Sequence, residues 1–142
     1  MRRLSLRQET SVPTSLVTVW APRALSVLRI VAALLFMEHG TSKLFGFPVW
    51  PAHGGPPVFT LIWFAGVIEA LGGLLLALGL FTRPAAFIMS GEMAIGYWTS
   101  HAPKSFFPLL SGGDAAVLYC FVFLYIFVAG GGPWSIDSLR SK

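Results

Sequence analysis

The sequence LLFMEHGTSKLFG, residues 34–46, places an acid, an imidazole and an amine in a strongly apolar run. Ionisable side chains in such a run are unfavourable in a bilayer unless they are paired or functional. The chain around this stretch has 142 residues, of which 55% are hydrophobic and only 11% are charged. This composition is far more apolar than that of an ordinary globular domain, and it predicts an all-α integral membrane protein.

Proline- and glycine-rich links divide the apolar sequence into four segments. The first three approach the roughly 20 residues that cross a hydrocarbon core, and the fourth is short for a full crossing. We therefore expect a four-helix bundle in residues 23–133, with spans at about 24–45, 59–81, 84–101 and 115–129. The link Thr82-Arg83-Pro84 is so short that the second and third spans must form an antiparallel hairpin. Pro84 suits the first position of the third helix, and Asp114 suits the N-cap of the fourth.

Residues 1–22 are expected to form a polar tail, with a short amphipathic turn around Leu16 to Trp20, and residues 134–142 form an exit tail. A basic start followed by an apolar run is also typical of a secretory signal. The apolar run here is too long for a signal, contains Arg29 and lacks a small-residue cleavage site. We interpret it as a retained first span.

The distribution of basic residues predicts that both termini are cytoplasmic. Lys43 and Lys104 fall on one side of the predicted spans, whereas the other basic residues fall on or near the opposite side. The latter are Arg2, Arg3, Arg7, Arg23, Arg29, Arg83, Arg140 and Lys142. Because they do not cluster on one periodic face, nucleic acid is not an expected partner. A single cysteine, Cys120, excludes an internal disulfide.

A helical rise of about 1.5 Å per residue separates the ionisable groups into two layers. Arg29, Glu69 and Glu92 fall between the inner half and the midplane, and Glu92 either neutralises Arg29 or is free for chemistry. Glu69 has no second evident cation at its depth, so it is either protonated or shares Arg29. Desolvation makes Glu69 and Glu92 the candidates for proton handling.

The outer layer contains Glu38, His39, Lys43 and His101. His39 and Lys43 are four residues apart on one side of the helix, while Glu38 lies about 100° away from His39. Lys43 is expected to extend its amine toward the membrane surface, as lysines near helix ends do. No metal site is predicted, because the paired Glu-x-x-His motifs of di-iron carboxylate bundles are absent.

Small residues at spacings of three and four follow one side of the second predicted helix. They are Gly66, Ala70, Gly73 and Ala77. Such a strip allows two membrane helices to approach closely. Glu69 borders the strip, so its side chain is expected to face protein.

Three blocks of this sequence resemble the DoxX family of small bacterial membrane proteins. They are Arg29 with HGTSKLFGF (39–47), EALGGLLLALGLFTR (69–83) and GGGPWSID (130–137), the last keeping the serine and aspartate of the usual closing motif. The resemblance covers about residues 23–137. It implies a four-helix bundle in the bacterial inner membrane that crosses it several times, with both ends cytoplasmic.

Relatives in that family are linked to a membrane subunit of thiosulfate:quinone oxidoreductase and to redox-stress complexes. The resemblance thus implies an accessory subunit that supports an oxidoreductase partner and holds a quinone or another small lipophilic molecule. The expected ligand-binding residues are Arg29, Glu38, His39, Lys43, Glu69, Glu92, Tyr97 and His101. A small oligomeric proton-coupled transporter and a structural assembly factor without ligand are the alternatives.

Overall fold

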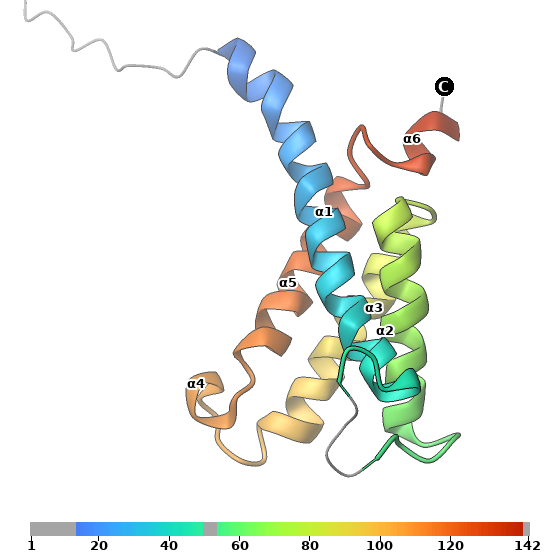
Figure 1. Ribbon diagram of the computed structural model, residues 1–142. Helices are drawn as coiled ribbons and strands as arrows, with labels where there is room; N and C mark the ends of the chain where they lie inside the picture. The colour runs from blue at the N-terminus through green and yellow to red at the C-terminus, as the bar shows by residue number, and fades with distance from the viewer. Residues whose placement is uncertain (1–13, 50–53, 141–142) are drawn as a thin grey trace, which may run out of the picture.

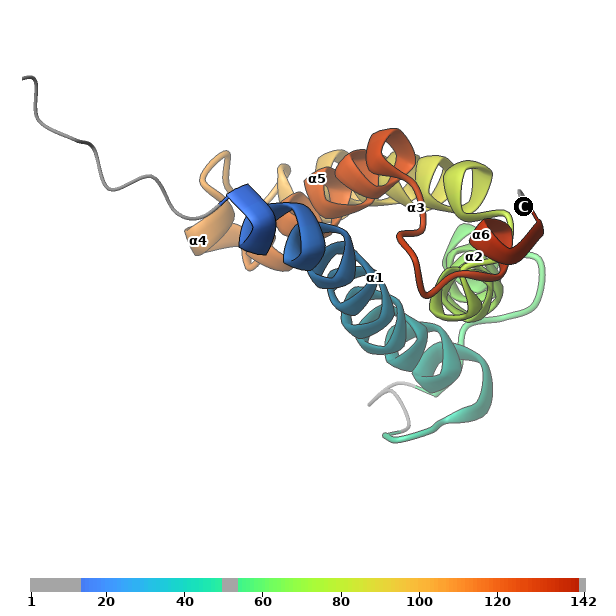
Figure 2. The same cartoon turned by 90° about the horizontal axis from the view of Figure 1, so that it is seen from above.

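The computed structural model describes residues 14–49 and 54–140, which contain helices and no strand (Figure 1). The prediction of an all-α chain is confirmed for these residues. The long helices are α1 (Thr14–Phe45), α2 (Leu61–Leu78), α3 (Thr82–Gly96) and α5 (Asp114–Ala129), and the short ones are the π-helix η1 (Tyr97–His101), α4 (Pro108–Ser111) and α6 (Ile136–Arg140). Helix α1 packs mainly along α2, and α3 packs mainly along α5 (Figure 2).

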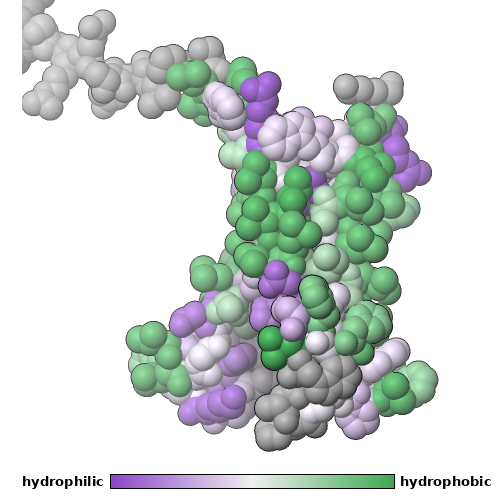
Figure 3. Space-filling model, in the orientation of Figure 1, coloured by the Kyte–Doolittle hydropathy of each residue, from purple (hydrophilic) through white to green (hydrophobic). Residues whose placement is uncertain are grey.

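Two of the described helices have the length and composition needed to cross a membrane. They are Leu16–Phe45 and Leu61–Leu78, and only 28% and 22% of their most apolar stretches are buried inside the protein. A core helix of a soluble protein would instead be mostly buried. On the face shown in Figure 3, a hydrophobic band covers the narrow middle of the molecule, and hydrophilic side chains gather nearer its two ends.

Helix α1 begins at Thr14, upstream of the span expected from Ala24. Residues 14–22, assigned from sequence to a polar tail, are thus helical in the structure, while residues 1–13 of that tail lie outside the described part. Pro22 lies inside the helix, where the Ser26 hydroxyl donates to the Pro22 carbonyl over 3.3 Å. A proline lacks the N–H that would donate to the carbonyl four residues earlier, which weakens the backbone ladder, but α1 continues past Pro22 to Phe45.

The connection between α2 and α3 lies earlier than the predicted turn at Thr82-Arg83-Pro84. Gly79 ends α2 in the left-handed region at φ 67°, and Phe81 also has a left-handed φ of 49°. Thr82 already belongs to α3, so Pro84 falls in the first turn of that helix and not at its first position. The expected hairpin of α2 and α3 is present, with its reversal at residues 79–81.

The sequence prediction for the start of the fourth helix was wrong. Asp114 is the first residue of α5, and the N-cap is Gly113 without a side-chain hydrogen bond. The predicted exit tail contains α6, which folds back against the end of α2. In that contact the Asp137 N–H donates to the Gly79 carbonyl over 2.9 Å.

The apolar core lies where α1, α2, α3 and α5 meet. Phe36 of α1 and Phe123 of α5 are fully buried, with ring centroids 4.8 Å apart in an edge-to-face arrangement. Leu76 and Met89 bring α2 and α3 into the same core. The core therefore joins the pair α1–α2 to the pair α3–α5.

Candidate functional site

Close packing of α1 on α2 positions the first functional side chains. A Cβ atom at Gly40 would meet the backbone N of Ala70 and would lie 2.7 Å from the carbonyl O of Gly66. A Cβ at Gly73 would lie 2.8 Å from the Cβ of Met37. The predicted small-residue strip on α2 thus packs on α1. Gly40 of α1 allows this approach because it has no side chain at the point of contact.

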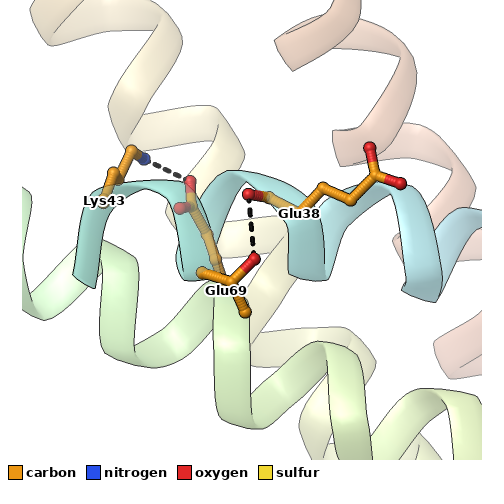
Figure 4. A network of polar contacts seen from close by, with 4 residues as sticks. Glu38, Lys43 and Glu69 are labelled. Atoms are coloured by element: carbon orange, nitrogen blue, oxygen red, sulfur yellow. Dashed lines mark hydrogen bonds and ion pairs between the residues drawn. The ribbon is translucent and has the colours of Figure 1, made fainter. Parts of the chain in front are cut away.

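An ion pair lies beside this contact. The Lys43 Nζ donates to Glu69 Oε1 over 2.5 Å, and the two side chains point toward each other from α1 and α2 (Figure 4). Glu69 is only 3% exposed, whereas Lys43 is 29% exposed. The expectation that Lys43 extends toward the membrane surface was wrong, because its amine turns to the Glu69 carboxylate of α2.

Glu92 of α3 is close enough for its charge to interact with those of Glu69 and Lys43. Among residues 14–49 and 54–140, neither of its two buried carboxylate oxygens has a hydrogen-bond partner, and the same holds for Oε2 of Glu69. Buried carboxylate oxygens almost always have partners. We name Lys43, Glu69 and Glu92 the three-helix cluster. Its carboxylate oxygens outnumber the hydrogen-bond donors that the described residues offer them.

Glu38 and His39 lie at the edge of this cluster and are both exposed. The Glu38 carboxylate points away from Glu69 along α1, while its backbone carbonyl accepts from the Thr41 hydroxyl over 3.2 Å (Figure 4). The His39 ring lies 6.5 Å from the ring of Tyr119 on α5. The charge of His39 also acts on Glu69. His39 therefore lies between the Lys43–Glu69 ion pair and the surface formed by α1 and α5.

Tyr97 and His101 form a separate site at the π-helix η1. Their rings are stacked with centroids 6.3 Å apart, and a Cβ at Gly113 would lie 2.8 Å from the Tyr97 ring. The Tyr97 hydroxyl donates to the Phe106 carbonyl over 2.7 Å, and His101 Nδ1 lies 3.1 Å from the Ser111 carbonyl. Among the described interactions, none joins these two residues to the three-helix cluster. Their hydrogen bonds instead fix the segment from Phe106 to Ser111, which contains α4.

Arg29 lies at the opposite end of the core and is fully buried. Its guanidinium donates to four backbone carbonyls, which belong to Leu76, Ala77 (2.8 Å), Gly131 (2.9 Å) and Trp134 (2.6 Å). The predicted pairing of Arg29 with Glu92, and its sharing by Glu69, were therefore wrong. A planar guanidinium can satisfy several fixed carbonyls at once, and this one joins α1 to the end of α2 and to the closing block 130–137.

Asp137 also belongs to this second region. We name the region the arginine knot, and it consists of Arg29, the C-terminal end of α2, the N-terminal end of α3 and residues 130–137. The Asp137 carboxylate accepts from the backbone N–H groups of Phe81 (3.0 Å) and Thr82 (2.8 Å). Partial desolvation acts to raise the pKa of Asp137, but these hydrogen bonds and the charge of Arg140 outweigh it and lower the pKa below its usual value. The conformation of Phe81, which is unusual for a non-glycine residue, is thus stabilised by the closing block.

Among the described residues, no group of three or more His, Cys, Asp or Glu side chains is placed to hold a metal ion. The chain is α-helical, two of its described helices are long and apolar enough to cross a membrane, and a partly buried ion pair joins α1 to α2. The family comparison makes the assignment specific. The family model for DoxX matches residues 24–102, and the chain belongs to the DoxX family.

A curated relative, an uncharacterized protein of Haemophilus influenzae (strain ATCC 51907 / DSM 11121 / KW20 / Rd), is 44% identical over 123 residues. The aligned region covers 84% of this chain and 92% of the relative. No solved structure matches the chain significantly. The identity of the protein as a DoxX family membrane protein follows from these comparisons, and its chemistry has to be argued from its own residues.

Proposed function

We propose that this protein is an accessory membrane subunit that binds a quinone or a similar small lipophilic molecule and supports an oxidoreductase partner. The observation that carries the proposal is the three-helix cluster, with three buried carboxylate oxygens lacking partners. A buried cluster of this kind is suited to exchange protons with a bound redox molecule. Glu69 and Glu92 are the candidate proton-handling groups, and Lys43 holds the charge of Glu69.

The route to the cluster runs past Glu38 and His39. Both are exposed, His39 contacts Tyr119 on α5, and Lys43 is itself partly exposed at its end of α1. A lipophilic molecule with a polar head would place its head near these groups and its apolar part along the exposed faces of α1 and α5. Arg29, Tyr97 and His101, expected from sequence to bind the ligand, have structural partners instead and are not included in this proposed site.

In the proposed membrane arrangement, the four long helices cross the bacterial inner membrane and both termini are cytoplasmic. Figure 1 places α6, the start of α1 and the α2–α3 reversal at one end of the molecule, and this end contains Arg23, Arg83 and Arg140. Lys43 and Lys104 belong to the segments at the other end. This asymmetry supports a cytoplasmic position for the arginine-rich end.

Purified full-length protein tests the ligand. A short-chain ubiquinone analogue is expected to raise the thermal unfolding temperature of the wild type and to lose that effect in Glu69→Gln. Asp114→Asn is the matched control, because Asp114 is an exposed acid at the start of α5 and its variant should respond like the wild type. A wild type that does not respond to quinone, and that carries none after purification, contradicts the ligand proposal.

A proton-coupled transporter is a second candidate, favoured by the unpartnered Glu92 carboxylate. It predicts substrate-dependent proton uptake by reconstituted vesicles, and loss of that uptake in Glu92→Gln. The absence of proton movement with wild-type protein contradicts it. An assembly factor using the small-residue strip as its docking face is less well supported, because Gly66 and Gly73 already contact α1.

A further inference from the structure

Eight large apolar side chains gather in two groups at the end of the molecule opposite α6. The first group, the α4 flange, is Phe106, Phe107, Leu109 and Leu110, with exposures from 64% (Phe107) to 80% (Leu109). The second, the α2 flange, is Val58, Phe59, Leu61 and Ile62, with exposures from 61% (Ile62) to 87% (Leu61). Such exposure is typical of a surface that is covered in the working protein.

Defined backbone contacts hold both flanges. In the α4 flange, the Phe106 carbonyl accepts from Tyr97, and the Ser111 N–H donates to the Phe107 carbonyl over 3.1 Å. In the α2 flange, the Thr60 hydroxyl donates to the Pro57 carbonyl over 2.7 Å and caps α2 at Trp63. Their side chains therefore point outward from an ordered backbone.

The flanges lie on opposite sides of the molecule. Figures 1 and 2 place α4 on one side and the start of α2 on the other, in two perpendicular views. A single flat protein partner would cover one flange and leave the other in water. A lipid bilayer surrounds a protein and covers both at once.

Each flange also continues into an exposed apolar helix face. From the α2 flange, Phe64, Leu71 and Leu78 follow at helical spacings along α2. Beyond the α4 flange, Leu118, Phe121, Tyr125 and Val128 follow along α5. These faces are the surfaces that a DoxX membrane protein presents to lipid, so the flanges extend an interface that the membrane location already requires.

We propose that both flanges insert into the same bilayer leaflet, so that the α4 loop is a membrane-embedded segment and not a loop in water. Large apolar and aromatic side chains at the edge of a span are well suited to this interfacial depth. Glu69 is eight residues beyond Leu61 in α2, about 12 Å deeper along the helix axis. The flanges therefore place the three-helix cluster below the membrane surface.

Spin labelling of full-length protein tests the proposal. Single cysteines replace Leu109, Phe106 or Leu61 in a Cys120→Ala background, and each labelled protein is reconstituted in vesicles of phosphatidylethanolamine and phosphatidylglycerol. The control is Lys104→Cys, because Lys104 is exposed and polar on the same connection as the α4 flange. The quantity measured is the collision rate of each label with oxygen, which partitions into lipid, and with a water-soluble nickel chelate.

We expect oxygen collisions to exceed nickel collisions several-fold at positions 109, 106 and 61, and the ratio to reverse at position 104. Two labels in the α4 flange keep the test valid if one of those variants fails to fold. Labels that collide preferentially with the nickel chelate at 109 and 61 would place both flanges in water and overturn the proposal. Labels shielded from both reagents would also overturn it, because a protein surface would then cover the flanges.

Discussion

The arginine knot and the three-helix cluster are both polar groups buried in an apolar protein, but they differ in how completely they are satisfied. Arg29 donates to four carbonyls that converge on it. In the cluster, one Lys43–Glu69 contact leaves three carboxylate oxygens without hydrogen-bond partners among the residues that the structure describes. A fully satisfied group stabilises one structure, whereas an unsatisfied one retains the capacity to bind a proton or a ligand. Substitutions in the two regions should therefore affect different properties.

The largest loss of stability is expected from Arg29→Met. This change removes the Arg29 donors from four backbone carbonyls, of which the Leu76 carbonyl still accepts from the Gly79 N–H. Each buried acceptor left unpaired costs about 1–3 kcal/mol. We expect a total loss of at least about 3 kcal/mol, measured by thermal unfolding in mild detergent. Arg29→Lys should recover only part of it, because an ammonium cannot match the planar guanidinium fork. Wild-type stability in Arg29→Met would refute the structural role of the knot.

A smaller loss is expected from Gly40→Ala at the contact between α1 and α2. The added Cβ would meet the backbone of Ala70 and Gly66, neither of which can rotate away. Overpacking of this kind costs about 1–3 kcal/mol. Gly91→Ala is the matched control, because a Cβ at Gly91 meets nothing within 4 Å. Equal unfolding temperatures for the two variants would contradict the close packing of α1 on α2 at Gly40.

Asp137 should make the stability of the folded protein depend on pH in the acid range. Its pKa is lower in the folded protein than its usual value, so the ionised form stabilises the fold. This contribution is complete above the unfolded pKa of about 3.9 and is lost as the pH falls through the lower folded pKa. Asp137→Asn should lower stability at pH 7 by about 1 kcal/mol, the usual effect of losing a helix cap.

The same variant should show a weaker decline in stability between pH 5 and pH 2, the range suggested by these pKa values. Unfolding midpoints of wild type and variant across that range provide the measurement. Parallel pH profiles would mean that the Asp137 carboxylate does not contribute through its charge.

The sequence predicted the helical class, the small-residue strip and the family, because these depend on local composition and spacing. It did not predict the partners of Arg29, since a backbone carbonyl has no side-chain signature. The serine and aspartate of the closing block were the available signal: Asp137 binds the start of α3, and Ser135 packs at Gly79.

The Lys43–Glu69 pair was missed for a different reason. Counting residues along each span placed the two Cα atoms at different depths, but a lysine and a glutamate side chain together bridge several ångströms. The approach of α1 to α2 at Gly40 then brings their charged ends to 2.5 Å. Depths estimated from helical rise give the positions of backbone atoms only. Ion pairs between long side chains can be predicted only when the packing of the helices is also known.

The most direct test of the central claim is to measure the unfolding temperature of Glu92→Gln with and without a short-chain quinone. Glutamine keeps the shape of Glu92 and removes its ability to ionise. Because the carboxylate has no hydrogen-bond partner in the described part of the chain, we predict that the variant without quinone unfolds at or above the temperature of the wild type. We also predict no further rise when quinone is added. A variant that unfolds much earlier than the wild type, or that responds fully to quinone, would contradict the assignment of function to the three-helix cluster.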